Sequence, residues 1–244
     1  MGTVITITSG KGGTGKTSIT GGVAASLALM GRRVLCIDMD IGLRNLDISL
    51  GLNDRCLMDF SDVALGRCPL VRAAAEHPDV KGLSLLTSPM TLPPSLTAEK
   101  VRALLAEARA GYDYILIDSP AGLGAGFRLA VCGADRAIVV STSDASSLRD
   151  AQRAVAELDG LRQIHLVMNR IQTKLLRKLR ATIDDAMDTA GLPLIGVVPE
   201  DPQVILCANL GRPLTTQGKR GAALACWNIA QRLEGHRVPI MRIR

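Results

Sequence analysis

The amino-acid sequence predicts an α/β fold with a single doubly wound, mostly parallel β-sheet that has helices on both faces. Short apolar, β-branched runs recur along the chain, and stretches with helical periodicity lie between most of them. The runs are continuously apolar rather than alternating, which is typical of parallel strands that are buried on both faces. The predicted strands are residues 4–8, 34–38, 83–87, 114–118, 137–141, 164–168 and 194–198.

Three helices and two loops are predicted around these strands. Segment 97–110 places apolar residues at the i, i+3, i+4 and i+7 spacing of one helix face, and further helices are expected over 17–30 and 218–234. Two segments rich in proline and turn residues, 89–94 and 199–213, are expected to form loops beyond the strand ends. Ligand sites of doubly wound folds lie in such loops.

Length and composition indicate one domain. The 244 residues are 47% apolar and 21% charged, which excludes a mainly disordered chain. The longest mainly apolar stretch, 21–30, is shorter than the roughly 20 residues of a membrane span, and the N-terminus does not resemble a signal peptide. We therefore expect a cytoplasmic protein, with one domain over 1–235 and a short basic C-terminal tail over 236–244.

Charge and side-chain chemistry restrict the partners only in part. The net charge of +6 permits an anionic partner without selecting one. Aromatic residues make up 2% of the chain, so few side chains are available to stack on single-stranded nucleic acid, and a nucleic-acid partner is not favoured. The six cysteines form no CxxC pair and show no ligand-like spacing with the histidines, which predicts free thiols rather than a zinc site.

A glycine-rich loop directly follows the first predicted strand. Residues 10–17 match the pattern GxxxxGK[ST] and lie between a strand and a helix, which is the context that the pattern requires. Backbone N–H groups at such a helix N-terminus bind phosphate, Lys16 reaches the β- and γ-phosphates, and the Thr17 hydroxyl binds Mg²⁺. The predicted nucleotide-binding residues of the loop are Gly10, Lys11, Gly12, Gly13, Thr14, Gly15, Lys16, Thr17 and Ser18.

Aspartates end two of the predicted strands. Asp38 and Asp40 follow the run that begins at residue 34, and Asp118 ends the run that begins at residue 114. A buried carboxylate is costly unless a cation or a hydrogen-bond donor pairs with it. The sequence therefore predicts that Thr17, Asp38, Asp40 and Asp118 hold a magnesium ion, with the alternative that Asp38 caps the next helix.

The loop resembles the deviant Walker A sequence, KGGxGK[ST], of the MinD/ParA family of P-loop ATPases, and residues 41–47 and 119–122 resemble the MinD-type switch regions. The resemblance implies a Mg²⁺-dependent ATPase that is active as an ATP-bound homodimer. It also implies that Lys11 reaches the phosphates bound by the partner subunit and that Asp40 orients the attacking water. Asp118 would be the Walker B carboxylate, and the Gly122 N–H would sense the γ-phosphate. The implied catalytic residues are Lys11, Lys16 and Asp40.

Two further strand ends supply candidates for binding the base. Asn169 and Arg170 follow the run at 164–168, and Pro199, Glu200 and Asp201 follow the last run. The resemblance implies that Asn169 hydrogen-bonds the adenine and that the other four residues help to form the pocket. An amide offers a donor and an acceptor, which suits the N6/N7 edge of adenine. A guanine-reading Thr-Lys-x-Asp motif is absent, which favours ATP over GTP.

The resemblance implies a role in placing the cell-division site, with partners of the MinC/MinE type that include a stimulator of hydrolysis. MinD-type proteins usually end in a basic amphipathic helix that binds the membrane when ATP is bound. The tail here contains a proline and few residues, so we expect at most weak contact with an anionic membrane surface at the inner face of the cell membrane. A partly ordered tail without that contact is the favoured expectation.

Other functions remain open at this level. Arg170, Lys174, Arg177 and Lys178 are spaced as on one helix face, which would suit a ParA-like ATPase for DNA partitioning or simply a solvated surface. A flagellar or other cellular positioning ATPase would share the core motifs. An iron–sulfur ATPase resembling the nitrogenase iron protein is disfavoured, because Cys132 lacks a suitably placed second cysteine.

Overall fold

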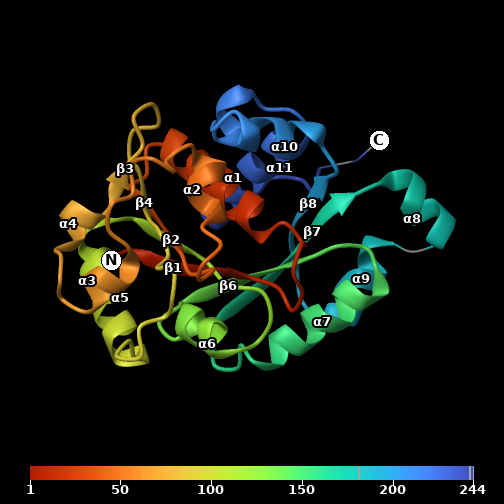
Figure 1. Ribbon diagram of the computed structural model, residues 1–244. Helices are drawn as coiled ribbons and strands as arrows, with labels where there is room; N and C mark the ends of the chain where they lie inside the picture. Colours follow the sequence, from red (N-terminus) through yellow and green to blue (C-terminus); the bar gives the residue numbers. More distant parts are fainter. Residues whose placement is uncertain (181, 242, 244) are drawn as a thin grey trace.

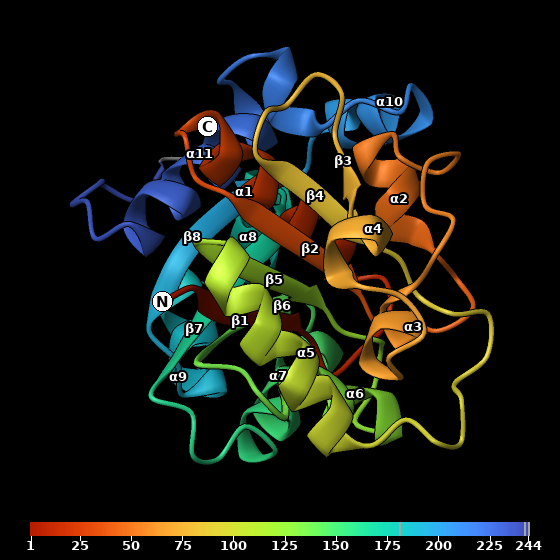
Figure 2. The same cartoon turned by 90° about the vertical axis from the view of Figure 1, so that its left-hand side faces the viewer.

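The computed structural model describes residues 1–180, 182–241 and 243, and within them it contains one eight-stranded sheet in the order β3-β4-β2-β5-β1-β6-β7-β8. The neighbouring strands are parallel except for β3, which pairs antiparallel with β4. Helices cover both faces of this twisted sheet (Figures 1 and 2), so the predicted fold class is confirmed. The strands are β1 (Thr3–Thr8), β2 (Val34–Asp38), β3 (Ala75–Glu76), β4 (Leu83–Leu86), β5 (Tyr114–Asp118), β6 (Arg136–Ser141), β7 (Gln163–Ile171) and β8 (Leu194–Pro199).

The three predicted helices form with ends that differ by a few residues from the prediction, as α1, α5 and α11. The helices are α1 (Lys16–Leu29), α2 (Asn45–Leu50), α3 (Phe60–Ala64), α4 (Leu70–Ala73), α5 (Ala98–Gly111), α6 (Ala125–Val131), α7 (Ala145–Ala156), α8 (Thr173–Leu179), α9 (Ile183–Ala190), α10 (Pro202–Asn209), the 3-10 helix η1 (Leu214–Gln217) and α11 (Gly221–Leu233).

The side chains of successive strand residues pack in cores on opposite faces of the sheet. In β1, Ile5 packs in the core that contains α1 and α11, whereas Val4 packs in a core that contains α5. A third core lies between β6, β7 and the helices α7 and α9. Both faces of the sheet are therefore covered by apolar cores.

Helix α1 lies close to α11. A Cβ atom placed on Gly22 would lie 2.6 Å from the Sγ atom of Cys226, so a larger residue would push the two helices apart. Cys226 is buried on the side of α11 that faces α1. This contact holds α1 in place, and the glycine-rich loop lies at the N-terminal end of α1.

Two predicted segments differ from the structure. The segment 199–213 is not a continuous loop, because α10 occupies its middle. The side chain of Asp201 accepts a hydrogen bond from the N–H of Gln203, and Pro202 fills the first helical position, both of which are start signals for a helix. Arg170 does not share a helix face with Lys174, since it lies in β7 and α8 begins at Thr173.

A single side chain connects β8 to the chain that follows α11. Arg232, in the last turn of α11, donates to three backbone oxygens: Ile195 O on β8 at 2.8 Å, Val238 O at 3.1 Å and Pro239 O at 2.7 Å. The tail therefore lies beside the edge strand. Two of the arginines predicted to make the tail basic, Arg242 and Arg244, lie outside the described residues.

Within the described part of the chain, every helix is too short or too polar to cross a membrane.

Candidate nucleotide site at the carboxyl edge of the sheet

The glycine-rich loop joins β1 to α1 and has a backbone that only glycine adopts readily at two places. Gly13 has φ of 78° and Gly15 has φ of 89°. A Cβ atom on Gly10 would lie 2.0 Å from the backbone oxygen of Asp150, so the loop also packs tightly against α7. Thr14 is buried, and its hydroxyl has no hydrogen-bond partner within the described part of the chain. A tight glycine loop with an unpaired buried hydroxyl fits a site that is completed by a polar ligand.

Lys16 is a buried cation at the start of α1. Its side chain is 7% exposed, and Nζ donates to Ser9 Oγ at 3.1 Å. Burial lowers the pKa of this ammonium, while the nearby carboxylates of Asp118 and Asp40 oppose the shift. Among the described residues Lys16 forms no ion pair within salt-bridge distance, so its charge remains available for an anion.

Asp38 and Asp118 lie opposite one another at the ends of β2 and β5. Burial, with Asp38 nearby, raises the pKa of Asp118 to about 7, although Thr17, Lys16 and Thr20 favour its charged form. Thr20 Oγ1 donates to Asp118 Oδ1 at 3.3 Å. Two buried carboxylates at neighbouring strand ends repel one another when both are ionised. A divalent cation bound between them would remove this repulsion.

Asp38 also organises the chain that follows it. Its two oxygens accept the N–H of Asp40 at 2.9 Å and the N–H of Leu46 at 3.2 Å, and Leu46 lies in the first turn of α2. Burial still raises the pKa of Asp38 to about 6. The capping role considered for Asp38 therefore has a structural counterpart, since both carboxylate oxygens accept backbone N–H groups.

Asp40 occupies the loop between β2 and α2. Burial raises the pKa of its carboxyl, and the charge of Lys16 opposes that shift. Its backbone oxygen accepts a hydrogen bond from Ser88 Oγ at 3.2 Å. Within the described residues, no group of three or more His, Cys, Asp and Glu side chains is arranged to hold a metal ion without other ligands. Any metal here would depend on phosphate or water for its remaining ligands.

Lys11 points away from the loop toward α7. Its Nζ atom donates to Ser146 Oγ at 2.8 Å and lies 3.3 Å from Asp144 Oδ1. The Thr142 hydroxyl, with further donors from Ser146, the Ser147 N–H and Lys11, holds the pKa of Asp144 well below its usual range. Lys11 is thus a solvent-accessible cation that contacts the first turn of α7.

Gly122 follows β5 and has φ of 80°. The preceding residue approaches the loop, since a Cβ atom on Gly12 would lie 3.7 Å from the Cβ of Ala121. The turn after β5 therefore lies beside the glycine-rich loop. This proximity allows its backbone to report on a ligand bound there.

The candidate base pocket is a cavity of about 240 Å³. It lies between the glycine-rich loop, the ends of β7 and β8, and the helices α10 and α11, and it brings the predicted base-binding residues together. The lining residues predicted from the sequence are Gly13, Gly15, Ser18, Asn169, Arg170, Pro199, Glu200 and Asp201. An adjoining cavity of about 420 Å³ extends from the loop and Lys11 to α8.

The residues of this pocket have different roles in the fold. Asn169 Nδ2 donates to the backbone oxygen of Thr14 at 2.8 Å. Arg170 Nη2 donates to Glu200 Oε1 at 3.1 Å. The carboxylate of Asp201 accepts the N–H groups of Gln203 and Ala222 at 3.0 and 2.9 Å, so it joins the starts of α10 and α11.

Sequence reasoning did not identify several partners of the predicted residues. Ser9 holds Lys16, Thr20 binds Asp118, and Ser146 holds Lys11. Thr20 could have been found, because it follows Thr17 by three residues on the same helix face. Ser146 carries no comparable signal, since it lies far from Lys11 in the sequence.

Comparisons with known proteins agree with this geometry. Residues 5–220 match the family described as the CobQ/CobB/MinD/ParA nucleotide binding domain. The septum site-determining protein MinD of Synechocystis sp. is 38% identical over 246 residues, which cover 99% of this chain and 92% of the relative.

Two solved structures extend the comparison. The MinC:MinD cell division protein complex of Aquifex aeolicus contains a chain that is 38% identical, with a TM-score of 0.91 and 98% coverage of both chains. The septum site-determining protein MinD of Pyrococcus horikoshii, complexed with Mg-ADP, is 29% identical, with a TM-score of 0.83 and 96% coverage of both chains. With its glycine-rich loop, buried Lys16 and paired strand-end aspartates, the chain belongs to the MinD group of the CobQ/CobB/MinD/ParA nucleotide-binding family.

Proposed function

We propose that this protein is an ATP-hydrolysing switch of the MinD type that acts in placing the cell-division site. The observation that carries the proposal is the buried ammonium of Lys16, which has no ion-pair partner among the described residues and lies at a glycine loop beside two buried carboxylates. Burying these charges costs free energy in a protein that binds nothing there. In a bound magnesium triphosphate, the phosphates would compensate the ammonium and the magnesium ion would compensate the carboxylates.

In this proposal the glycine-rich loop and Lys16 bind the phosphates of ATP. The Thr17 hydroxyl would bind Mg²⁺, with Asp38, Asp40 and Asp118 around the ion and its water ligands. The bound ion supplies positive charge that stabilises the negative charge developing on the phosphates. The fit rests on the chemistry of these donors, all of which are oxygens, and on the raised pKa values of Asp38 and Asp118.

Asp40 is the residue that we assign to the attacking water. It is less buried than Asp38, and its carboxylate accepts no hydrogen bond from the residues that the structure describes, so its oxygens are free to accept a proton or a hydrogen bond from water. Gly122, on the turn beside the loop, would donate its N–H to the γ-phosphate. The adenine would occupy the 240 Å³ cavity against Asn169.

Lys11 supports the proposal that ATP binding promotes homodimerisation. Its ammonium is exposed, and among the described residues its partners are the exposed side chains of Asp144 and Ser146. Exposed pairs of this kind contribute about 0–1 kcal/mol, so Lys11 can leave α7 at low cost for a phosphate bound by a second copy. In that position it would stabilise the charge of phosphoryl transfer, as an arginine finger does.

A MinC-type partner is supported by a solved relative, and a MinE-type stimulator of hydrolysis is part of the same proposal. The Aquifex aeolicus structure is described as a MinC:MinD complex, which supports a MinC-like partner for this chain. Membrane attachment in the ATP-bound state belongs to the same proposal. Liposome co-sedimentation with ATP and with ADP, using the full chain and a chain that ends at Gly235, would measure it.

The alternative of DNA partitioning is not favoured. Of the four basic residues predicted to share a face, Arg170 binds Glu200 and lies on a different element from the other three. The named relatives are division-site proteins. Salt-sensitive, ATP-dependent binding to nonspecific DNA that is lost when Lys174, Arg177 and Lys178 become Glu would reopen this alternative.

The decisive experiment compares hydrolysis and binding in one variant. Asp40→Ala should abolish Mg²⁺-dependent phosphate release while ATP still binds, because the change removes the group assigned to the water and leaves the loop intact. Asn53→Ala, at an exposed position, is the control for substitution itself. An Asp40→Ala protein that hydrolyses ATP at the normal rate would contradict the assignment.

A further inference from the structure

Asn169 lies at an irregularity near the end of β7. The pairing of β7 with β8 passes from Met168 opposite Val197 to Ile171 opposite Pro199. Two residues of β7 therefore face one residue of β8. A bulge of this kind redirects side chains relative to the regular alternation of a strand.

The two residues of the bulge point in different directions. Asn169 is 6% exposed and reaches toward the glycine-rich loop. Arg170 is exposed, has a left-handed backbone with φ of 56°, and binds Glu200 on the neighbouring chain segment. The bulge thus places one side chain inside the site and secures its neighbour outside.

The contact of Asn169 with the loop is specific. Its Nδ2 atom donates to the backbone oxygen of Thr14 at 2.8 Å in a buried environment. A carbonyl oxygen can only accept, so the amide nitrogen must face Thr14, and the amide oxygen remains for a ligand in the cavity. A Cβ atom on Gly15 would lie 2.3 Å from the same nitrogen, which shows how closely the amide rests on the loop.

We propose that Asn169 is a positioning residue for the phosphate-binding loop, in addition to any contact that it makes with the base. Its donor fixes the peptide group at Thr14, two residues before Lys16, and so holds the loop N–H groups in the orientation that receives phosphate. Without that donor, Thr14 O is left buried and unpaired, and the loop relaxes. This inference rests on the proposed nucleotide-binding function.

The proposal separates two effects of one side chain, and inorganic tripolyphosphate distinguishes them because it has phosphates and no base. Asn169→Ala and the isosteric Asn169→Asp both remove the donor to Thr14. We expect Asn169→Ala to lower the affinity for Mg²⁺-tripolyphosphate about tenfold, measured by titration calorimetry, since a buried acceptor loses its partner. Asn169→Asp should lower it further, because its carboxylate also repels the phosphates. Asn53→Ala, an asparagine change on the surface, should leave this affinity unchanged.

Hydrogen exchange of the ligand-free proteins supplies a second readout. We expect faster amide exchange over residues 10–16 in Asn169→Asp than in the wild type, with no change in α5, which shows that the rest of the chain is folded. If both variants bind tripolyphosphate as the wild type does and lose affinity only for ATP, Asn169 acts on the base alone and the proposal is wrong. A wild type that binds tripolyphosphate but not ATP would overturn the proposed function and not this inference.

Discussion

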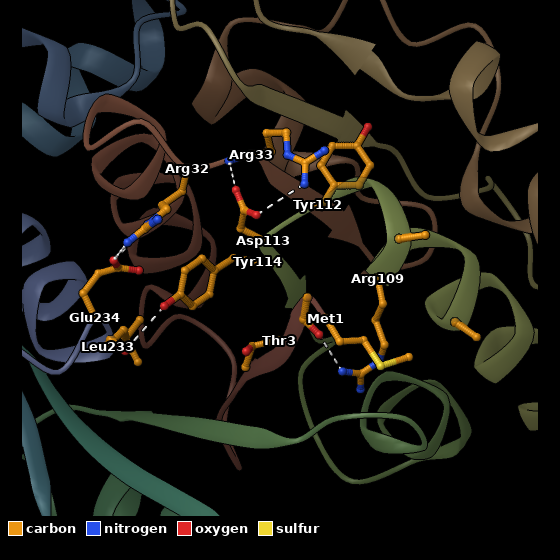
Figure 3. A pocket seen from close by; sticks show the side chains of 13 residues that line it. Met1, Thr3, Arg32, Arg33, Arg109, Tyr112, Asp113, Tyr114, Leu233 and Glu234 are labelled. Atoms are coloured by element: carbon orange, nitrogen blue, oxygen red, sulfur yellow. Dashed lines mark hydrogen bonds and ion pairs between the residues drawn. The ribbon is translucent and has the colours of Figure 1, made fainter.

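The two ends of the parallel strands differ in how their charged side chains are paired. We call them the carboxyl edge, where the strands end, and the amino edge, where they begin. At the carboxyl edge, Lys16 and Asp118 are buried without an ion-pair partner among the described residues. At the amino edge, Arg33 pairs with Asp113 at 3.4 Å, and Arg32 pairs with Glu234 (Figure 3). The first edge is prepared for a charged ligand, and the second has its charges matched within the chain.

Cavity size alone would favour the amino edge over the candidate site. The amino-edge pocket in Figure 3 has a volume of about 620 Å³ and a second cavity, lined by Arg33, Gly82 and Tyr112, has about 810 Å³, against about 240 Å³ for the base pocket. The wall of the pocket in Figure 3 also includes Arg109, which binds Asp135 twice, at 2.6 and 3.0 Å. Because these guanidinium groups already have carboxylate partners, a larger space does not indicate a stronger site.

The largest expected effect is on Lys16. Lys16→Ala should lower ATP affinity by at least about a hundredfold, since it removes the buried cation assigned to the phosphates. Arg32→Ala, at the amino edge, should leave ATP affinity unchanged. Titration calorimetry with Mg-ATP measures both. If the two variants lost ATP affinity equally, the proposed difference between the two edges would be wrong.

The acidic residues of the two edges should differ in the sign of their pH dependence. Burial raises the pKa of Asp118 to about 7, so the folded chain keeps a proton that the unfolded chain has lost, and the ligand-free protein loses stability as pH rises from about 4 to 7. The backbone N–H of Arg33 lowers the pKa of Asp113. Asp113 therefore contributes stability above its unfolded pKa, and this is lost as pH falls through the lowered folded pKa.

Asp118→Asn should accordingly stabilise the ligand-free protein near pH 7.5 by roughly 2–4 kcal/mol, with little gain near pH 4.5. Asp113→Asn should reduce stability slightly near pH 7.5. Urea denaturation at the two pH values measures both changes. The comparison fails if Asp118→Asn destabilises the protein equally at both.

A pair of glycine variants isolates the tight packing of the loop. Gly15→Ala and Gly31→Ala both place alanine at positive φ, at 89° and 87°, but only the former meets a neighbour, Asn169. Each should lose about 1–2 kcal/mol from the backbone, and Gly15→Ala should lose about 1–3 kcal/mol more from the clash. Chemical denaturation gives the difference, which should vanish if the loop can move away from Asn169.

The smallest expected effect is at the amino edge. Arg33→Ala should change the free energy of unfolding by less than about 1 kcal/mol, and less again at high salt, because its pair with Asp113 is exposed. Urea denaturation at low and high salt tests this. A loss of several kcal/mol would mean that the amino edge is also a site of strong charge interactions.

Local patterns made most of the fold predictable. All seven predicted runs became strands, because continuous apolar segments in a buried parallel sheet carry a strong signal. Strand β3 was missed, since two residues show no periodicity. The sequence analysis did not predict helix α10, because the surrounding prolines suggested a loop. Asp201 and Pro202 are nevertheless typical residues for the start of a helix.

The site was predictable where its residues are consecutive. The glycine-rich loop and the strand-end aspartates follow from local sequence, and the structure brings them to one edge of the sheet. The hydrogen bonds of Lys11 with Ser146 and of Asn169 with Thr14 join residues far apart in the chain, so no periodicity reports them. The bulge that turns Arg170 outward depends on pairing with β8, which the basic spacing of 170–178 does not reveal.

The guanidinium of Arg232 donates to one carbonyl of the edge strand β8, Ile195 O, and at the same time to two carbonyls of the returning chain. An exposed strand edge invites pairing with another molecule. Since the end of α11, the edge strand and the tail share one side chain, fraying of α11 would leave Ile195 O without this donor and release the tail at the same moment.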